Sequence, residues 1–193
     1  QTEYIAAARA QRQHMSEPGV TDERVDRILR RTLGRSSHHQ VLTHGERHGV
    51  MIGEGVSGKD DIRTIWRIKT VGSAAGKLSQ LPLGSELTDI FGATLITNDA
   101  HQSGVQLNTA LLSALKDPRM TLRPSPQRDK PLHVRGTPEF IDEVADGMGM
   151  ASVAELDKIA DLRRTHAQDY HVAKLSMDYQ EWGEERPTSV EIQ

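Results

Sequence analysis

The chain has 193 residues, of which 36% are hydrophobic, and a formal net charge of −3. It contains no cysteine, which excludes disulfides, thiolate metal sites and a cysteine nucleophile. The sequence has no apolar run of roughly 20 residues and no N-terminal apolar signal segment. We therefore expect a protein of the cytoplasm or of a macromolecular particle, without membrane contact.

The N-terminal part predicts two helices. Residues 3–15 are rich in alanine, and Pro18-Gly19 ends this segment. Thr21 can cap a second helix that ends at Gly34 and buries an apolar stripe. The other face of this helix is basic and carries Arg24, Arg27, Arg30 and Arg31.

The pattern changes towards strands after residue 41. The run Val50–Ile52 is apolar and lies between glycines, and residues 62–71 are rich in β-branched side chains, although Ile62, Ile65 and Trp66 also fit a helix. Residues 72–77 predict a glycine-lysine turn, and residues 86–91 a short helix closed by Gly92.

Two further elements precede a proline-rich segment. Residues 93–97 predict an apolar strand, and leucines at helical spacing predict a helix that stops at Asp117-Pro118. Residues 117–131 hold four of the eight prolines and several basic side chains, which predicts a stiff extended linker.

The last third predicts a strand, two helices and a tail. Residues 132–135 favour a strand, and Thr137-Pro138 begins a helix that runs to about Asp146. Ser152 and Glu155 form a capping box at the start of a longer helix. The tail is acidic and carries three aromatic side chains.

Together these elements predict an α+β fold. We expect a mixed N-terminal domain at residues 1–116, a proline-rich basic linker at 117–131, and a small helical C-terminal module with an acidic aromatic tail at 132–193.

The segment 44–61 suggests two kinds of small-molecule chemistry. His44, Glu46 and His48 lie two residues apart, so on a strand they share one face and could bind one metal ion. Residues 53–59 fit the phosphate-binding pattern G-x-x-x-x-G-K through Gly53, Gly58 and Lys59, although Asp60 replaces the hydroxyl residue that binds magnesium. Histidine-rich loops and glycine turns without ligands are the alternative interpretation, and the sequence requires no cofactor.

The last third also resembles parts of two DNA-binding motifs. Residues 144–150 resemble the second helix and turn of a helix-turn-helix, and the predicted strand, helix and second helix resemble a ribbon-helix-helix. Both elements are acidic, so phosphate contacts would come mainly from the linker and the strand. The candidate nucleic-acid-binding residues are Arg123, Arg128, Lys130, His133 and Arg135.

The aromatic tail predicts a docking segment. Tyr170, Tyr179 and Trp182 would be buried against another surface, and the flanking Glu181 would pair with a basic patch. The basic face of the second helix offers such a patch, within the chain or on a neighbouring copy.

No catalytic set along the chain is complete, so the leading hypothesis is a non-enzymatic structural or interaction subunit of a larger protein assembly. Its partners would be other protein subunits, its own copies included. The first alternative is a DNA-binding accessory or regulatory protein. The second is a metal- or phosphate-dependent enzyme centred on residues 44–61.

Overall fold

A computed structural model describes most of the chain. It covers residues 2–12, 27–28, 30–31, 40–47, 50–56, 63–82, 84–87, 90–124, 129–166, 170–183 and 187–193, with the backbone alone for 40–47, 50–56, 63 and 64. Within these ranges the chain forms helices and one mixed sheet, which confirms the predicted α+β class.

The sheet has nine strands in the described part of the chain, in the order β1-β2-β3-β4-β9-β8-β6-β7, with β5 also paired to β8. Strands β1 to β4 are antiparallel neighbours, whereas β4 and β9 are parallel, and so are β6 and β7. The strands are β1 (Gln40–Arg47), β2 (Val50–Val56), β3 (Arg63–Lys69), β4 (Phe91–Ile96), β5 (Met120–Leu122), β6 (Leu132–Gly136), β7 (Ala160–Arg164), β8 (Val172–Tyr179) and β9 (Thr188–Ile192).

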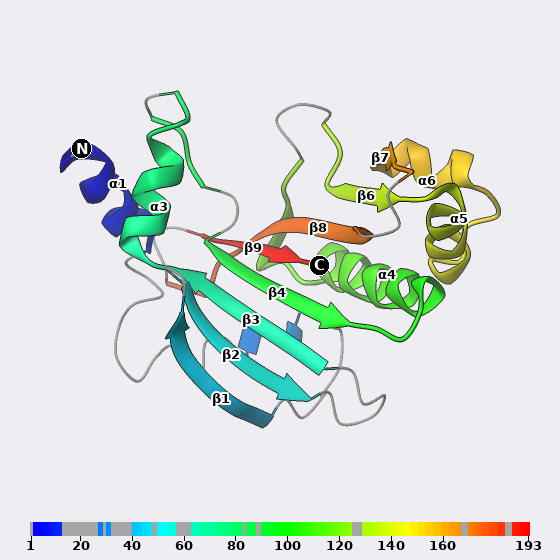
Figure 1. Ribbon diagram of the computed structural model, residues 1–193, viewed down its shortest axis with the longest axis horizontal. Helices are drawn as coiled ribbons and strands as arrows, with labels where there is room; N and C mark the ends of the chain where they lie inside the picture. Colours follow the sequence, from blue (N-terminus) through cyan, green and yellow to red (C-terminus); the bar gives the residue numbers. More distant parts are fainter. Residues whose placement is uncertain are drawn as a thin grey trace.

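The helices lie in two groups (Figure 1). One group contains α1 (Thr2–Arg12) and α3 (Val71–Leu78), which pack together. The other contains α4 (Ala100–Lys116), α5 (Pro138–Gly147) and α6 (Val153–Ile159), and α4 packs against α5 and β8. Side-chain oxygens of Thr70, Asp99 and Thr137 accept backbone N–H groups at the starts of α3, α4 and α5, which satisfies donors that a helix leaves unpaired.

Two glycines bring α4 and α5 into backbone contact. A Cβ at Gly104 would overlap the Val144 carbonyl oxygen, and one at Gly147 would overlap the His101 carbonyl oxygen. Because neither glycine has a side chain, the two helices approach more closely than ordinary residues permit.

The two faces of the central sheet differ in polarity. One face is apolar and joins the core with α4, through alternate residues of β3, β4, β9 and β8 such as Trp66, Ile192 and Leu175. The opposite face carries the intervening positions, and Arg67, Gly92, Glu191 and Ser176 form one row across four strands. Strand alternation therefore separates an apolar core face from a polar face.

Several predicted elements are confirmed. Helix α1, strands β2, β3, β4 and β6, and helices α4 and α5 lie where the sequence predicted them, within a few residues at their ends. The segment that fitted both a strand and a helix is strand β3. Of the predicted second helix, residues 27, 28, 30 and 31 are described, and they are helical.

Other predictions were wrong. The glycine-lysine turn at 72–77 is helix α3, because Ala74, Ala75 and Leu78 are buried on one side of it. The helix predicted at 86–91 is absent from its described residues, and Phe91 begins strand β4 instead. The helix that starts after Ser152 ends at Ile159, where the chain continues into β7.

The helical description of residues 132–193 was also wrong, because this part supplies β6, β7, β8 and β9 besides two helices. Strand β9 pairs with β4 of the predicted N-terminal domain, so one sheet includes strands from both sides of the predicted linker. Within that linker, residues 120–122 form β5 and pair with β8. The domain boundaries themselves stay a prediction.

Among the described residues, no helix combines the length and the apolar character that crossing a membrane requires.

Candidate functional site

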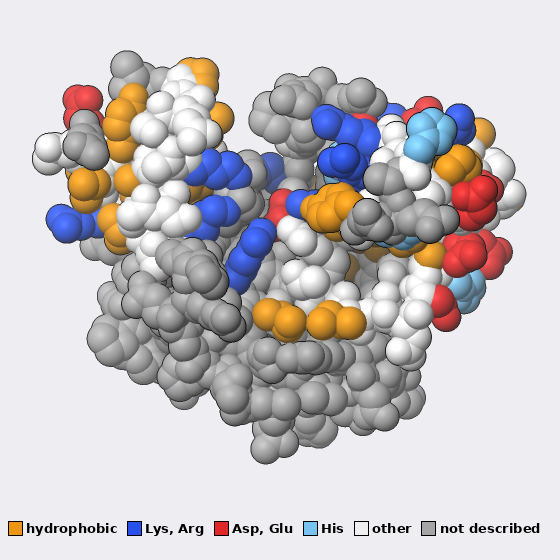
Figure 2. Space-filling model, in the orientation of Figure 1, with side chains coloured by type: hydrophobic (Ala, Val, Ile, Leu, Met, Phe, Trp, Pro, Cys, Tyr) orange, Lys and Arg blue, Asp and Glu red, His pale blue; other side chains and the backbone are white. Residues whose placement is uncertain are grey.

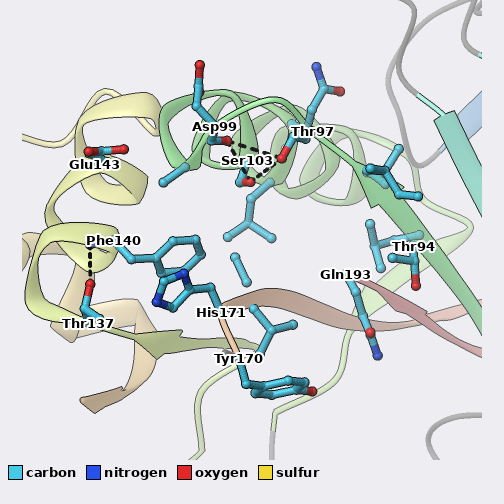
Figure 3. A pocket seen from close by; sticks show the side chains of 18 of the residues that line it. Thr94, Thr97, Asp99, Ser103, Thr137, Phe140, Glu143, Tyr170, His171 and Gln193 are labelled. Atoms are coloured by element: carbon cyan, nitrogen blue, oxygen red, sulfur yellow. Dashed lines mark hydrogen bonds between the residues drawn. The ribbon is translucent and has the colours of Figure 1, made fainter. Parts of the chain in front are cut away.

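A pocket lies at one edge of the sheet, outside the carboxyl ends of β4 and β9, and we call it the edge pocket (Figure 3). Its volume is about 720 Å³. The N-terminal parts of α4 and α5 and residues 170–173 complete its wall. Ligands of α/β proteins commonly bind outside the carboxyl ends of parallel strands, so this position makes the pocket a candidate site.

One side of the edge pocket is formed by a stacked pair of rings. The Phe140 and His171 rings lie 4.7 Å apart between centroids, with 16° between their planes. Gly136 permits this arrangement, because a Cβ there would overlap Phe140 and lie 3.1 Å from His171 Cδ2. The stack therefore depends on a missing side chain in β6.

Another side of the edge pocket holds a small hydroxyl cluster (Figure 3). The hydroxyl oxygens of Thr97 and Ser103 lie 2.6 Å apart, and both hydroxyls also approach the Asp99 carbonyl oxygen. The Asp99 carboxylate accepts the Gln102 N–H at 2.6 Å, so it caps α4 while it lies at the pocket mouth. The cluster fixes the turn between β4 and α4.

The polar side of the sheet carries a second candidate site. We call it the charged face and define it by Arg67 and Lys69 of β3, Lys174 of β8 and Glu191 of β9. Figure 2 shows lysine and arginine side chains gathered beside α3 and towards the middle of the molecule. The charged face thus contains three cationic side chains and one carboxylate.

Glu191 lies at the centre of the charged face. Its Oε1 is 3.7 Å from Arg67 Nη2 and 3.4 Å from Lys174 Nζ, and it also accepts the Gln193 side-chain amide. Gly92 lies between Arg67 and Glu191 in the sheet, and a Cβ there would be 3.1 Å from Arg67 Nε. The glycine leaves room for the arginine to extend across β4.

An ion cluster of one arginine and two carboxylates lies next to the charged face. Arg123 Nε is 3.1 Å from Asp178, and the same guanidinium donates to Ser189 and Glu86 at 3.1 Å each. The Ser189 hydroxyl in turn donates to Asp178 at 3.0 Å. These contacts join β5, β8 and β9, so Arg123 has a structural role here.

Comparison of the chain with protein-family models, with curated proteins and with solved structures gave no match.

The structure describes the predicted metal-binding residues only in part. His44 and Glu46 are two residues apart on β1, as predicted for residues that share a strand face, while their side chains and His48 lie outside the described residues. Among the described residues, no three histidine or acidic side chains are grouped as a metal site would require. Metal binding at 44–48 stays a prediction.

The predicted phosphate loop begins inside a strand. Gly53 and the three residues after it belong to β2, which pairs with β1 and β3 on its two sides. Backbone N–H groups in such a ladder are bonded to neighbouring strands, which does not favour a phosphate-cradling loop in this half of the segment. Phosphate binding at 53–59 stays a prediction. Gly58 and Lys59 lie outside the described residues.

The predicted nucleic-acid residues mostly contact groups of their own chain. Lys130 donates to the Asp157 and Ala160 carbonyl oxygens, and His133 lies 3.4 Å from Asp161. Arg135 lies over the Tyr170 ring at 5.3 Å, while Arg128 is outside the described residues.

The strand of the predicted ribbon motif also has an unfavourable position for groove entry. Strand β6 is paired on both sides, with β7 and β8. The major groove admits a helix or a two-stranded ribbon, whereas β6 belongs to a nine-stranded sheet. DNA binding through His133 and Arg135 stays a prediction, and this geometry does not favour it.

The three tail aromatics have different surroundings. Tyr179 is fully buried in the core, and its hydroxyl donates to Glu181. Glu181 accepts Arg27 Nε at 3.0 Å, so its predicted pairing with the basic face of the second helix occurs within the chain. Trp182 is 79% exposed and Tyr170 is 50% exposed.

The charged face does not follow from the predicted elements, because two of its strands, β8 and β9, were not predicted. In residues 172–179 every second side chain is apolar, including Leu175, Met177 and Tyr179. A repeat of two residues indicates a strand with one buried face. That signal could have identified β8 and the outward position of Lys174.

Proposed function

We propose that the protein binds a small polyanionic ligand, such as a phosphorylated metabolite, on the charged face. The observation that carries the proposal is that Arg67 and Lys174 both approach Glu191 on one side of the central sheet. Lys69 lies two residues after Arg67 in β3, on the same side. Two cationic side chains lie beside one carboxylate, so the group formed by Arg67, Lys174 and Glu191 has a net charge of +1.

The geometry leaves donors for a ligand. An arginine has five N–H donors and a lysine has three. Arg67 Nη2 lies 3.7 Å from Glu191, which is longer than a hydrogen bond, and the Arg67 side chain is 41% exposed. A phosphate that approaches this face could therefore accept bidentate hydrogen bonds from Arg67 and a further bond from Lys174.

Calorimetry with inorganic pyrophosphate and triphosphate at low salt tests the proposal. Arg67→Gln and Lys174→Gln should each weaken binding about tenfold, because a charge-assisted hydrogen bond is lost. The matched control is Lys158→Gln on α6, an exposed lysine whose loss should leave the affinity unchanged.

Two results would contradict this function. One is a wild-type protein that binds neither anion at low salt. The other is an equal loss of affinity in Lys158→Gln and Arg67→Gln, which would indicate attraction by the overall charge. Binding should also weaken as salt is raised, because salt screens exposed charges.

A second candidate function is that of a non-enzymatic interaction subunit of a larger protein assembly. Exposed apolar side chains favour it. Trp182 is 79% exposed, and Val105, Leu112 and Leu115 are exposed along one side of α4 at spacings of seven and three residues. Exposed apolar groups of this size commonly contribute to protein contacts.

Light scattering tests the interaction function. Deletion of the tail is unsuitable, because it would remove β8 and β9 from the middle of the sheet. We would therefore compare the molar mass of the wild type with those of Trp182→Ser and Leu115→Ser. If both variants have the molar mass of an assembled wild type, these two surfaces do not form the contacts of the assembly.

A further inference from the structure

We infer that the edge pocket binds a small organic amine with an apolar body. This inference is independent of the anionic ligand proposed for the charged face. It rests on the size of the pocket, its apolar wall and the sign of the charges at its mouth.

The size and the wall define the body of the ligand. A volume of about 720 Å³ lies within the range of small-molecule sites, which is about 300–1,000 Å³. The inner wall combines the stacked Phe140 and His171 rings with aliphatic side chains of β4, β8, β9 and α4. The aliphatic side chains are Leu95, Leu107, Val172 and Ile192. An aromatic or branched aliphatic body would bury its surface against this wall.

The charges at the mouth define the end group of the ligand. Asp99, Glu139 and Glu143 all line the pocket and are exposed. None of the described lining residues is a lysine or an arginine. The carboxylates therefore give the mouth a negative potential that attracts an ammonium group and repels a carboxylate or phosphate.

The helix N-termini at the mouth do not reverse this sign. The N-terminus of α4 is capped by the Asp99 carboxylate, and that of α5 by the Thr137 hydroxyl. Hydrogen bonds from the Glu139 backbone N–H and the Thr137 side chain lower the pKa of Glu139 below its ordinary value, so this carboxylate is ionised at neutral pH. The dipole of α5 thus faces a negative side chain rather than open solvent.

Three probes with the same aromatic ring and different end groups test the inference. We expect phenethylamine to bind the full chain by calorimetry and to raise its melting temperature, phenethyl alcohol to bind more weakly, and hydrocinnamate not to bind. Equal binding of all three probes, or preference for hydrocinnamate, would overturn the inference.

Substitutions at the mouth test the role of charge. The double variant Glu139→Gln and Glu143→Gln should weaken phenethylamine binding about two- to fivefold for each carboxylate lost, because exposed ion pairs contribute modestly. Its affinity for phenethyl alcohol should stay unchanged. An unchanged amine affinity in the double variant would contradict the inference.

Substitutions in the wall test the location. Ala173→Leu should narrow the pocket and weaken binding of both the amine and the alcohol. Ala100→Leu, at the first position of α4, narrows the pocket from the other side and serves if Ala173→Leu does not fold. An amine affinity that is unchanged in a folded variant of either kind would overturn the inference. Arg67→Gln should leave amine binding unchanged, which separates this site from the charged face.

Discussion

Arg67 of β3 lies 3.7 Å from Glu191 of β9, although strand β4 separates their two strands. Adjacent strands are about 4.8 Å apart, so an arginine must extend across a whole strand to reach its second neighbour. It can do so because the intervening position is Gly92, which has no side chain to obstruct the path. Gly92 therefore determines where the Arg67 side chain lies, and this side chain is more exposed (41%) than that of Lys174 (24%).

The substitution Gly92→Ala should separate anion binding from stability. The new Cβ would lie 3.1 Å from Arg67 Nε, and the flexible arginine would move away from Glu191. Because a strand conformation suits alanine, the fold should be stabilised by up to about 1 kcal/mol. Calorimetry should show weaker pyrophosphate binding than in the wild type, with no loss of melting temperature. Unchanged pyrophosphate binding would mean that the position of Arg67 does not limit it.

The substitution Glu191→Gln tests whether the positive charge of the charged face controls pyrophosphate affinity. Removal of the one carboxylate should leave Arg67 and Lys174 with a larger positive excess. Pyrophosphate should then bind more tightly than to the wild type at low salt, and the difference should shrink as salt is added. Weaker binding in this variant would show that Glu191 is needed to hold the two cations in place.

The contact between α4 and α5 should not tolerate a methyl group. Gly104→Ala should destabilise the protein by about 1–3 kcal/mol, because the Cβ would overlap the Val144 carbonyl oxygen. Gly76→Ala in α3 is the matched control. Nothing lies within 4 Å of its Cβ position, and alanine should stabilise that helix by up to about 1 kcal/mol. Urea denaturation measures both changes, and equal effects at the two glycines would contradict the close packing.

Tyr179 should ionise at unusually high pH. Burial and the hydrogen bond to the Glu181 carboxylate raise the pKa of Tyr179 to about 12. A raised pKa contributes stability that is fully present below the ordinary value near 10 and is lost as pH rises towards 12. Tyrosinate absorbance during alkaline titration should show one late transition that Tyr179→Phe removes. A complete titration near pH 10 in the folded protein would contradict this environment.

Asp117 should stabilise the junction after α4 at neutral pH. Although burial raises its pKa, hydrogen bonds from Arg119 and from Arg31 lower the pKa below the ordinary value overall. Asp117→Asn should cost about 1–3 kcal/mol at neutral pH. Because the lowered pKa gives stability that is lost as pH falls through it, the difference from the wild type should begin to shrink below about pH 4 and should disappear only at a lower pH. A constant difference across that range would assign the loss to packing instead.

The sequence by itself determined most of the local structure. Thr137-Pro138 marks the start of α5, and the leucine periodicity of residues 107–115 marks α4. Both signals are local to one helix, so no distant residue is needed to predict either helix. The β-branched residues of 63–69 favour a strand for the same local reason.

Only the tertiary structure decided which strands are neighbours. Strand β9 lies next to β4 although almost a hundred residues separate Phe91 from its partner Val190, and no local pattern encodes that pairing. The pairing brings Glu191 beside Gly92 and Arg67. The glycines show the same division, because Gly76 is tolerated within a helix while Gly104 is required by a second helix. Helix and strand propensities depend on residues that are close in sequence. The charged face and the edge pocket depend instead on contacts between segments that are distant in sequence.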